Sequence, residues 1–502
     1  MNKALIACLL MMFGAALAFG QDEKVVNGKF TDGLKGWHTT GDVHLQKNVQ
    51  DGRMAACIGK GGGTLGQRIK IGGGNPFTLS AIIRSQRTKS WLLTLRFLDK
   101  HGRELMRVDS ETDIKITGLD PQKIDHYMQP HTLTKWVQIL LSKKPGDDSA
   151  VVEQVGLDMP DENAVHLKPA CNLDLAMRPF WLQGEVHDEA VLMLSQNGKP
   201  AAGQLLFRPT RIISVRDYGL TTNYAEESDY TVQGRTLTCT ASTAMPRVRD
   251  KDLQKCEYKW NVIGGKQVMV TYEHDDGWAN QVPEYFGDKL PGTMKKLHQH
   301  RPLTVVAYGD SITHGYGESR LSHIRPFLPP WPELFVVRLA EIFHDNKIQF
   351  YNSSQSGATS GWGKDYAQRM VCSLRPDLVL VAFGQNDFWS ISPDLFSTNI
   401  AEIIQAIRTA NPKAEFILIS PLRFDPAYTT NTAYWNAVGD YAKRMKAMTG
   451  PGIQFVDMTA ISEKVYAAKK PKDCMNDPLH PNDYFARWYA QCVVAALEPS
   501  RP

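Results

Sequence analysis

The feature that most constrains the fold is a regular alternation of short apolar runs and helical stretches that begins at residue 301. The runs are rich in β-branched residues and have the length of buried strands; they lie at residues 303–308, 348–351, 378–383, 415–419 and 453–456. The expected helices lie at residues 331–343, 393–410, 431–449 and 482–496. Strands of this kind, separated by helices, require a parallel sheet covered on both faces. Residues 301–502 are therefore predicted to form a doubly wound, three-layer α/β domain.

Polar segments that contain glycine follow the first three predicted strands, and a polar segment without glycine precedes the last helix. They contain Ser311, Gly357, Asn386 and the pair Asp477 and His480. In such a sheet, ligands bind beyond the carboxyl ends of the strands. We therefore expect these residues, spread over about 170 positions, to meet at one edge of the sheet.

The residue types in these segments suit nucleophilic catalysis. The hydroxyl of Ser311 is a poor nucleophile at neutral pH and needs a base that takes its proton. His480 can be that base, because an unperturbed histidine has a pKa of about 6.5. Asp477 lies three residues earlier and can accept a hydrogen bond from the other ring nitrogen, which fixes the tautomer and stabilises the imidazolium. Ser311, Asp477 and His480 are the predicted catalytic residues.

These segments resemble the conserved blocks of the SGNH/GDSL hydrolase family. The Ser, Gly, Asn and His of those blocks are matched in order by Ser311, Gly357, Asn386 and His480 over the last 200 or so residues. The resemblance implies a flavodoxin-like fold and a serine esterase without cofactor or metal. It also implies an oxyanion hole formed by the N–H groups of Ser311 and Gly357 and the side-chain amide of Asn386. Ser354 stands where the family commonly has a further Gly, which affects the freedom of the loop more than the chemistry.

Other residues near these segments are expected to orient loops, to pack or to line a pocket rather than to take part in the chemistry. Asp310 and Asp387 are expected to orient loops through backbone N–H groups, and His314 to be packed or exposed rather than to act as a second base. Four residues are placed to line a substrate pocket: Tyr316, Trp362, Trp389 and Arg423.

Residues 21–178 are predicted to form an all-β domain of the sandwich or jelly-roll type. Short alternating runs recur there, and glycine clusters are expected to separate the strands. The runs lie at residues 77–83, 91–97 and 136–141, and the clusters at residues 61–63 and 72–74. The opening, Val26-Asn27-Gly28 followed by Gly36-Trp37, resembles carbohydrate-binding modules of the galactose-binding type. In such modules this tryptophan is usually in the core, and the alternative is a platform that stacks on a sugar ring.

Residues 179–300 are predicted to form a second, smaller β-sandwich domain. Asn197-Gly198 is a strong hairpin signal, Gln233-Gly234 is another, and residues 268–272 have the composition of a strand. His298 and His300 have no third ligand nearby in the sequence and are expected to lie in a solvated linker.

Residues 1–20 have the basic start, short apolar run and small-residue ending of a secretory signal peptide. We expect a secreted or periplasmic protein with no transmembrane segment, and the lipoprotein-like box before Cys8 is interpreted as chance. Without Cys8, seven of the 8 cysteines remain, so at least one thiol is unpaired. A Cys239–Cys256 bridge is the favoured pairing, and the alternative is that most cysteines are small buried residues.

The charge balance bears on the partner of this protein. Lys and Arg number 57 against 53 Asp and Glu, a net charge of +4 without a long basic run, so a nucleic-acid partner is not expected. The favoured function is removal of O-acetyl groups from a polysaccharide such as acetylated xylan or pectin. One alternative is a lipase or short-chain esterase that acts on a non-carbohydrate ester. Another is a glycan-binding protein with an inert hydrolase domain. Metal-dependent deacetylation is disfavoured because no cluster of metal ligands is visible.

Overall fold

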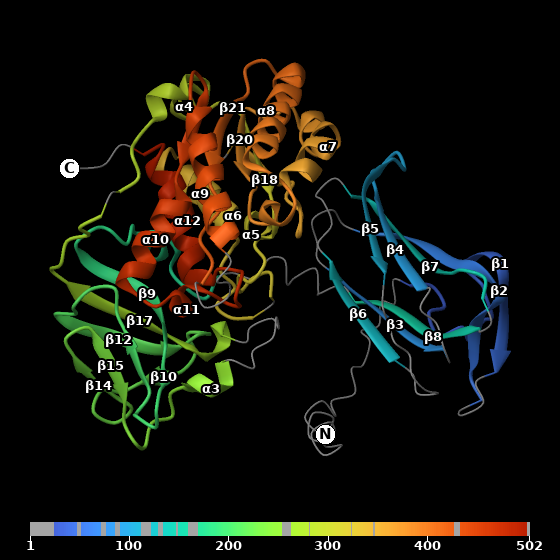
Figure 1. The fold of residues 1–502 in the computed structure, drawn as a ribbon, viewed down its shortest axis with the longest axis horizontal. Helices are drawn as coiled ribbons and strands as arrows, with labels where there is room; N and C mark the ends of the chain where they lie inside the picture. Colours follow the sequence, from blue (N-terminus) through green and yellow to red (C-terminus); the bar gives the residue numbers. More distant parts are fainter. Residues whose placement is uncertain are drawn as a thin grey trace. The chain divides into compact units, whose positions relative to one another are not determined.

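The computed structural model divides the chain into two compact units, residues 1–166 and 167–502 (Figure 1). It describes residues 25–47, 52–71, 77–85, 91–111, 122–128, 134–146, 149–158, 169–253, 263–280, 282–322, 324–344, 347–425 and 432–498. The predicted signal peptide, Cys256 and the glycine cluster at 72–74 lie outside these residues. Among the described residues, no helix is both long and apolar enough to span a membrane.

The first unit is built from antiparallel β-strands, as predicted. Its sheet has the order β5-β4-β7-β2-β8-β3-β6, and β1 also pairs with β2. The strands are β1 (His38–Lys47), β2 (Met54–Lys70), β3 (Phe77–Ser85), β4 (Trp91–Leu98), β5 (Glu104–Glu111), β6 (Gln122–Met128), β7 (Trp136–Lys143) and β8 (Ala150–Asp158).

The glycine cluster at 61–63 does not separate strands, contrary to the prediction, because it lies inside β2. A Cβ atom at Gly63 would lie 2.4 Å from the carbonyl oxygen of Thr40 in β1, so the strands approach too closely there for a side chain. Trp37 is 7% exposed and packs on Phe30 with ring centroids 5.5 Å apart. This places Trp37 in the core of the first unit.

The second unit begins with a β-rich region, residues 184–274, which holds two sheets. Their orders are β13-β12-β17-β9 and β14-β15-β11-β10-β16. The strands are β9 (Gly184–Leu192), β10 (Leu194–Ser195), β11 (Ala202–Gln204), β12 (Arg211–Asp217), β13 (Asn223–Tyr224), β14 (Tyr230–Gln233), β15 (Thr236–Cys239), β16 (Val248–Arg249) and β17 (Gln267–His274). Short helices flank them: α2 (Leu173–Ala176), α3 (Asp250–Leu253) and η2 (Gly264–Lys266).

Both predicted hairpin turns in this region are confirmed. Asn197 and Gly198 have φ of 52° and 74° between β10 and β11, the positive values that a type I′ turn requires. Gly234 has φ of 60° between β14 and β15. The predicted Cys239–Cys256 bridge is wrong, because Cys239 is a free, buried thiol; it packs in the core as a small apolar residue.

The rest of the second unit is the predicted α/β domain. Its five-stranded sheet is parallel and has the order β19-β18-β20-β21-β22. The strands are β18 (Leu303–Gly309), β19 (Ile348–Asn352), β20 (Leu378–Ala382), β21 (Glu415–Ile419) and β22 (Ile453–Val456). This doubly wound order places a switch point between β18 and β20, where ligands bind in such sheets.

The helices of this domain form two groups: α6 packs on α12, whereas α7 packs on α8 and α8 on α9 (Figure 1). The α-helices are α4 (Pro291–His298), α5 (Ser311–His314), α6 (Trp331–Ile342), α7 (Ser360–Met370), α8 (Pro393–Ala410), α9 (Thr432–Ala447), α10 (Met458–Ala468), α11 (Pro471–Cys474) and α12 (Asp483–Ala495). The single-turn 3₁₀ helices are η3 (Gly287–Lys289), η4 (Cys372–Leu374) and η5 (Asp387–Trp389).

The β-rich region and the α/β domain share one hydrophobic core. Val191 and Tyr272 of the β-rich region belong to the same buried cluster as Trp331 and Trp488 of the α/β domain. The first unit has a separate cluster, which includes Phe77 and Ile139. The predicted domain boundaries at residues 178 and 300 stay predictions.

Candidate active site

Ser311 is positioned by the sharp turn between β18 and α5. Gly309 ends the strand where a Cβ atom would lie 2.3 Å from the carbonyl oxygen of Ala382 in β20, so only glycine fits there. Asp310 caps α5 by accepting a hydrogen bond from the N–H of Ile312 at 3.0 Å. The turn therefore presents Ser311 at the carboxyl end of the sheet.

His480 and Asp477 meet Ser311 in one chain of hydrogen bonds. His480 Nε2 lies 3.0 Å from Ser311 Oγ, and His480 Nδ1 lies 2.9 Å from Asp477 Oδ2. Because a carboxylate only accepts hydrogen bonds, Nδ1 carries the proton and Nε2 is left to accept the serine hydroxyl. Asp477 Oδ1 also accepts the N–H groups of Leu479 and His480 at 2.8 and 2.9 Å. The carboxylate thus holds both the imidazole ring and its own loop.

Gly357 and Asn386 lie on two loops that are joined to each other at the same edge of the sheet. Gly357 has φ of +77°, a conformation that favours glycine. Asn386 Nδ2 donates to the carbonyl oxygen of Ala358, the residue after Gly357, at 2.9 Å. An amide nitrogen carries two hydrogens, so this bond fixes the orientation of the amide while using one of them. The N–H of Gln355 donates to Gly309 at 3.0 Å, which joins the Gly357 loop to the end of β18.

Two buried carboxyl groups hold these loops in place, as expected for Asp310 and Asp387. Asp310 Oδ2 accepts the N–H of Gln385 at 3.3 Å, and Asp387 accepts the N–H of Ser360 at 2.9 Å. Burial raises the pKa of Asp310 to about 7 and that of Asp387 to about 6, although the backbone donors oppose the shift. Ser360, which also donates its hydroxyl to Asp387, was not predicted; only its position after the Gly357 segment could have indicated it.

His314 is buried and lies with its Nδ1 3.0 Å from Ser356 Oγ. Burial lowers its pKa to about 4, so the ring is neutral at pH 7. This position agrees with the prediction of a packed residue rather than a second base.

The four predicted pocket residues lie in different surroundings. The Tyr316 ring lies 4.3 Å from the His480 ring, centroid to centroid. Trp362 stacks on Tyr366 at 4.8 Å, and Trp389 is 72% exposed. Arg423 donates to Glu463 at 2.7 Å and lies over the ring of Trp435. Tyr316 is thus beside His480, whereas the guanidinium of Arg423 is engaged in an ion pair.

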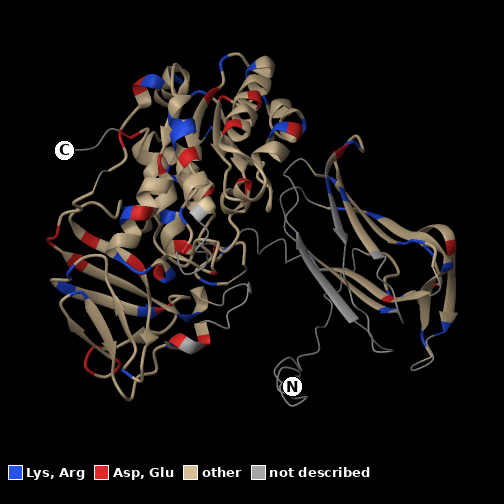
Figure 2. Cartoon of the chain, in the orientation of Figure 1, with Lys and Arg blue, Asp and Glu red and all other residues tan. Residues whose placement is uncertain are grey.

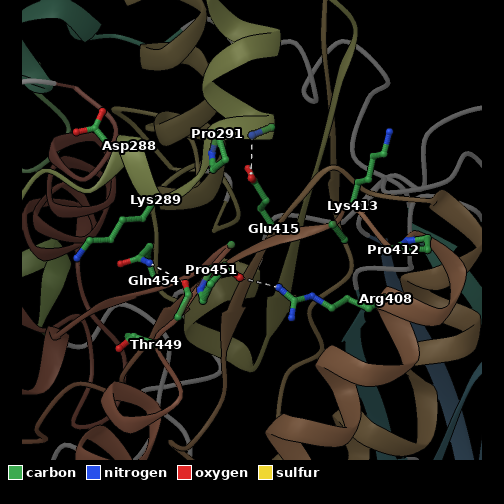
Figure 3. Close-up of a pocket in the computed structure, with 14 residues that line it drawn as sticks. Asp288, Lys289, Pro291, Arg408, Pro412, Lys413, Glu415, Thr449, Pro451 and Gln454 are labelled. Carbon is green, nitrogen blue, oxygen red and sulfur yellow. Dashed lines mark hydrogen bonds between the residues drawn. The ribbon is translucent and has the colours of Figure 1, made fainter.

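A pocket of about 790 Å³ lies at the other edge of the sheet (Figure 3). Its walls include Glu415, the first residue of β21, and Gln454 near the start of β22. Glu415 accepts the N–H groups of Gly292 and Thr293 at the start of α4, at 2.8 and 2.7 Å. Ser311 follows the opposite, carboxyl end of its strand, so this pocket does not belong to the candidate active site. In the described part of the chain, His, Cys, Asp and Glu form no group of three that could hold a metal ion.

Comparisons with known proteins indicate the family of the C-terminal part of the chain. Residues 307–488 match the model of the GDSL-like Lipase/Acylhydrolase family, and this C-terminal part of the chain is a hydrolase domain of the GDSL/SGNH family. An arylesterase from Vibrio mimicus is 24% identical over 196 residues, which are 38% of this chain and 87% of the relative. These findings support an esterase or acylhydrolase of the GDSL type.

Two solved structures are each similar to part of the chain. An acetylxylan esterase from Geobacillus stearothermophilus, solved as a catalytic mutant, matches 39% of this chain and 95% of its own, with 18% identity and a TM-score of 0.34. A carbohydrate-binding module in complex with β-1,4-galactotriose matches 28% of this chain and 99% of its own, with 18% identity and a TM-score of 0.22.

Proposed function

We propose that this protein is a serine esterase that removes O-acetyl groups from a polysaccharide through an acyl-enzyme intermediate. The observation that carries the proposal is the hydrogen-bonded chain from Ser311 through His480 to Asp477. The distances lie within the range of 2.6–3.2 Å or so that a nucleophile and its base require.

In the first half-reaction, Ser311 Oγ attacks the acyl carbon while His480 Nε2 takes the hydroxyl proton. The carbonyl oxygen becomes an oxyanion, and the N–H groups of Ser311 and Gly357 and the amide of Asn386 are the proposed donors to it. When the tetrahedral intermediate collapses, the bond to the sugar oxygen breaks and His480 gives that oxygen its proton. Acetyl-Ser311 and a free sugar hydroxyl result.

In the second half-reaction, water attacks the acyl carbon and gives a proton to His480. The bond to Ser311 Oγ then breaks, Oγ regains the proton, and acetic acid leaves. Asp477 stabilises the imidazolium in both halves without taking its proton. Asp310 and Asp387 act indirectly, by fixing the turns that carry the oxyanion donors. Asp310 accepts the N–H groups of Ile312 and Gln385, and Asp387 accepts the N–H of Ser360.

An acetylated polysaccharide is the proposed substrate class for three reasons. Residues 1–20 predict export, residues 21–178 resemble a glycan-binding module in their opening motif, and Lys/Arg and Asp/Glu are interspersed over the elements of the second unit (Figure 2). The mixed charge favours neither nucleic acid nor a strongly anionic surface. A lipid or other small ester is the second candidate, favoured by the arylesterase relative.

The test is acetate release from acetylated xylan and pectin by wild type and by Ser311→Ala. We expect release by the wild type and a loss of about 10⁴–10⁶ in kcat in the variant. Fluorophosphonate labelling that Ser311→Ala abolishes identifies the nucleophile. A series of 4-nitrophenyl esters separates the substrates, since a sharp preference for acetate supports the polysaccharide. Cleavage of long-chain esters without acetate release from any glycan contradicts this substrate class, and absence of labelling contradicts the mechanism.

A further inference from the structure

The loop that carries Asp477 and His480 is held by a corner of the β-rich region. This corner, residues 263–267, comprises the residue before η2, the η2 turn and the first residue of β17. The N–H groups of Ile263 and Gly264 donate to the carbonyl oxygen of Asn476 at 3.1 and 3.4 Å. Asn476 immediately precedes Asp477, so these bonds act one residue away from the proposed triad.

Gln267 joins the two ends of the same loop. Its Nε2 donates to the carbonyl oxygens of Lys472 and Met475 at 2.7 and 3.0 Å. Its Oε1 accepts from Asn482 Nδ2 at 2.8 Å. Gln267 is fully buried, and a buried amide that loses such partners carries a desolvation cost of about 1–3 kcal/mol. One side chain therefore closes the base of the loop between residues 472 and 482.

Asn476 links this corner to His480: its side chain lies against Gly264, and its backbone N–H is bonded to His480. A Cβ atom at Gly264 would lie 2.2 Å from Asn476 Oδ1. On the other side, a Cβ atom at Gly317 would lie 3.4 Å from Asn476 Nδ2 and 3.0 Å from His480 Cβ. Asn476 is fully buried, and its backbone N–H donates to the carbonyl oxygen of His480 at 2.8 Å. A displacement of Asn476 thus moves the backbone of His480.

A second set of contacts anchors the chain just before this loop. Lys469 donates to Glu189, with which it forms a fully buried ion pair, and to the carbonyl oxygen of Ala190 at 2.8 Å. Asp473 accepts the N–H of Leu192 at 2.7 Å. All three partners, Glu189, Ala190 and Leu192, lie in β9, so the sheet that contains β17 holds the approach to the loop as well.

We propose that Gly264 and Gln267 are positioning residues for the catalytic histidine, and that the β-rich region is thereby part of the catalytic apparatus. The proposal rests on the esterase function proposed above. Gly264 allows Asn476 to approach the corner, and Gln267 fixes the two ends of the loop. Together they hold His480 Nε2 within reach of Ser311 Oγ.

The glycine pair in η2 offers a matched test. In Gly264→Ala the added methyl group collides with Asn476, whereas in Gly265→Ala it meets no atom within 4 Å. A misplacement of about 1 Å can cost about 10²-fold in rate, so we expect kcat for 4-nitrophenyl acetate to fall 10- to 100-fold or so in Gly264→Ala. KM should stay within about twofold of wild type, and Gly265→Ala should match wild type in both constants.

The second readout is the low-field proton resonance of His480 Nδ1–H, assigned with His480→Gln. It should be present in wild type and Gly265→Ala, and shifted or lost in Gly264→Ala at a temperature where all three are folded. Gln267→Met keeps the volume but removes the three hydrogen bonds, and it should show the same loss. Unchanged kcat and an unchanged resonance in folded Gly264→Ala overturn the proposal. Absence of turnover and of fluorophosphonate labelling in wild type overturns the esterase function, while the resonance still tests the positioning of His480.

Discussion

The two β-rich regions of this chain have similar composition and turn signals but different relations to their surroundings. Residues 25–158 form a sheet with a hydrophobic core of its own. In residues 184–274, most of the described buried apolar side chains lie in a core shared with the α/β domain, and a smaller cluster around Leu194 and Val248 belongs to this region alone. Gln267 of this region also binds the loop that carries Asp477 and His480. Arg487 of the last helix donates to the carbonyl oxygen of His187 in this region at 2.8 Å. The comparison shows that strand content does not reveal whether a β region is a separable module.

The largest expected effect comes from deleting each region in turn. Removal of residues 1–166 leaves the core of the second unit complete, so residues 167–502 should fold and keep kcat for 4-nitrophenyl acetate within about twofold. Removal of residues 184–274 exposes the α/β side of the shared core to water. It also removes the hydrogen-bond partners of the loop that carries Asp477 and His480. That deletion should abolish soluble, active protein.

The measurements for this pair are soluble yield, near-UV circular dichroism and kcat of each truncated protein against full-length chain. Loss of activity on removing residues 1–166 would contradict the separability of the first unit for a small substrate. An active protein without residues 184–274 would contradict the role of the shared core. With an acetylated polysaccharide in place of the small ester, the first deletion also tests whether the first unit binds glycan.

A smaller effect is expected from breaking one ion pair in each region. Lys469 and Glu189 are both 0% exposed, whereas Arg84 and Glu153 of the first unit are both 17% exposed. Removing one partner of a buried pair leaves an uncompensated charge, so Lys469→Met should lower the free energy of unfolding of the second unit by about 3–5 kcal/mol. Arg84→Met leaves a carboxylate that water can reach, and about 1 kcal/mol or less is expected.

Calorimetry of the full-length protein measures both changes, because two separate cores predict two transitions. The transition of the second unit is identified by its absence from the isolated first unit. Equal shifts in the two variants would contradict the argument from burial. The double variant Lys469→Met with Glu189→Met serves as control, since it also removes the carboxylate of Glu189. Asp473, the second buried carboxyl beside Lys469, at 3.8 Å, is the same in the single and double variants and does not affect their difference.

Much of the α/β domain could be predicted from sequence because its signals are local. The expected strands at 415–419 and 453–456 coincide with β21 and β22, and the helix at 393–410 coincides with α8. The apolar runs and helical periods are continuous there. Helices α7 and α10 were missed; α7 contains two glycines and begins three residues after Gly357, the end of the segment interpreted as a catalytic loop. The glycine cluster at 61–63 was predicted to be a turn but lies inside β2. Glycine is typical both of turns and of places where two strands approach closely, so the sequence does not distinguish them.

In the candidate site too, residues in local motifs could be predicted, and residues brought together only by the fold could not. Ser311, Asn386 and His480 could be found because each lies in a short motif at a strand end or before a helix. Gln267 could not, since it lies 205 residues before Lys472 and only the fold brings them together. The pocket role of Arg423 stays a prediction, and its ion pair with Glu463 could not be predicted because the two residues lie 40 positions apart.

The last expected effect is smaller than that of Lys469→Met and concerns pH and the transition of the second unit alone. The pKa of His314 is about 4 in the folded protein against an ordinary value of 6.5, so the unfolded chain binds more protons below pH 6.5. The stabilising contribution of neutral His314 is present above that pH and is lost as the pH falls toward 4, by about 2 kcal/mol between pH 7.5 and pH 5. His314→Gln keeps a polar partner for Ser356 but does not titrate. Its free energy of unfolding relative to wild type should therefore rise by about 2 kcal/mol as the pH falls from 7.5 to 5. Asp310 and Asp387 have raised pKa values and act in the opposite direction, but they are common to both proteins and cancel in the difference. A relative stability that stays constant from pH 7.5 to pH 5 would show that His314 is protonated in the fold or accessible to water, and the transition of the first unit should be the same in both proteins throughout.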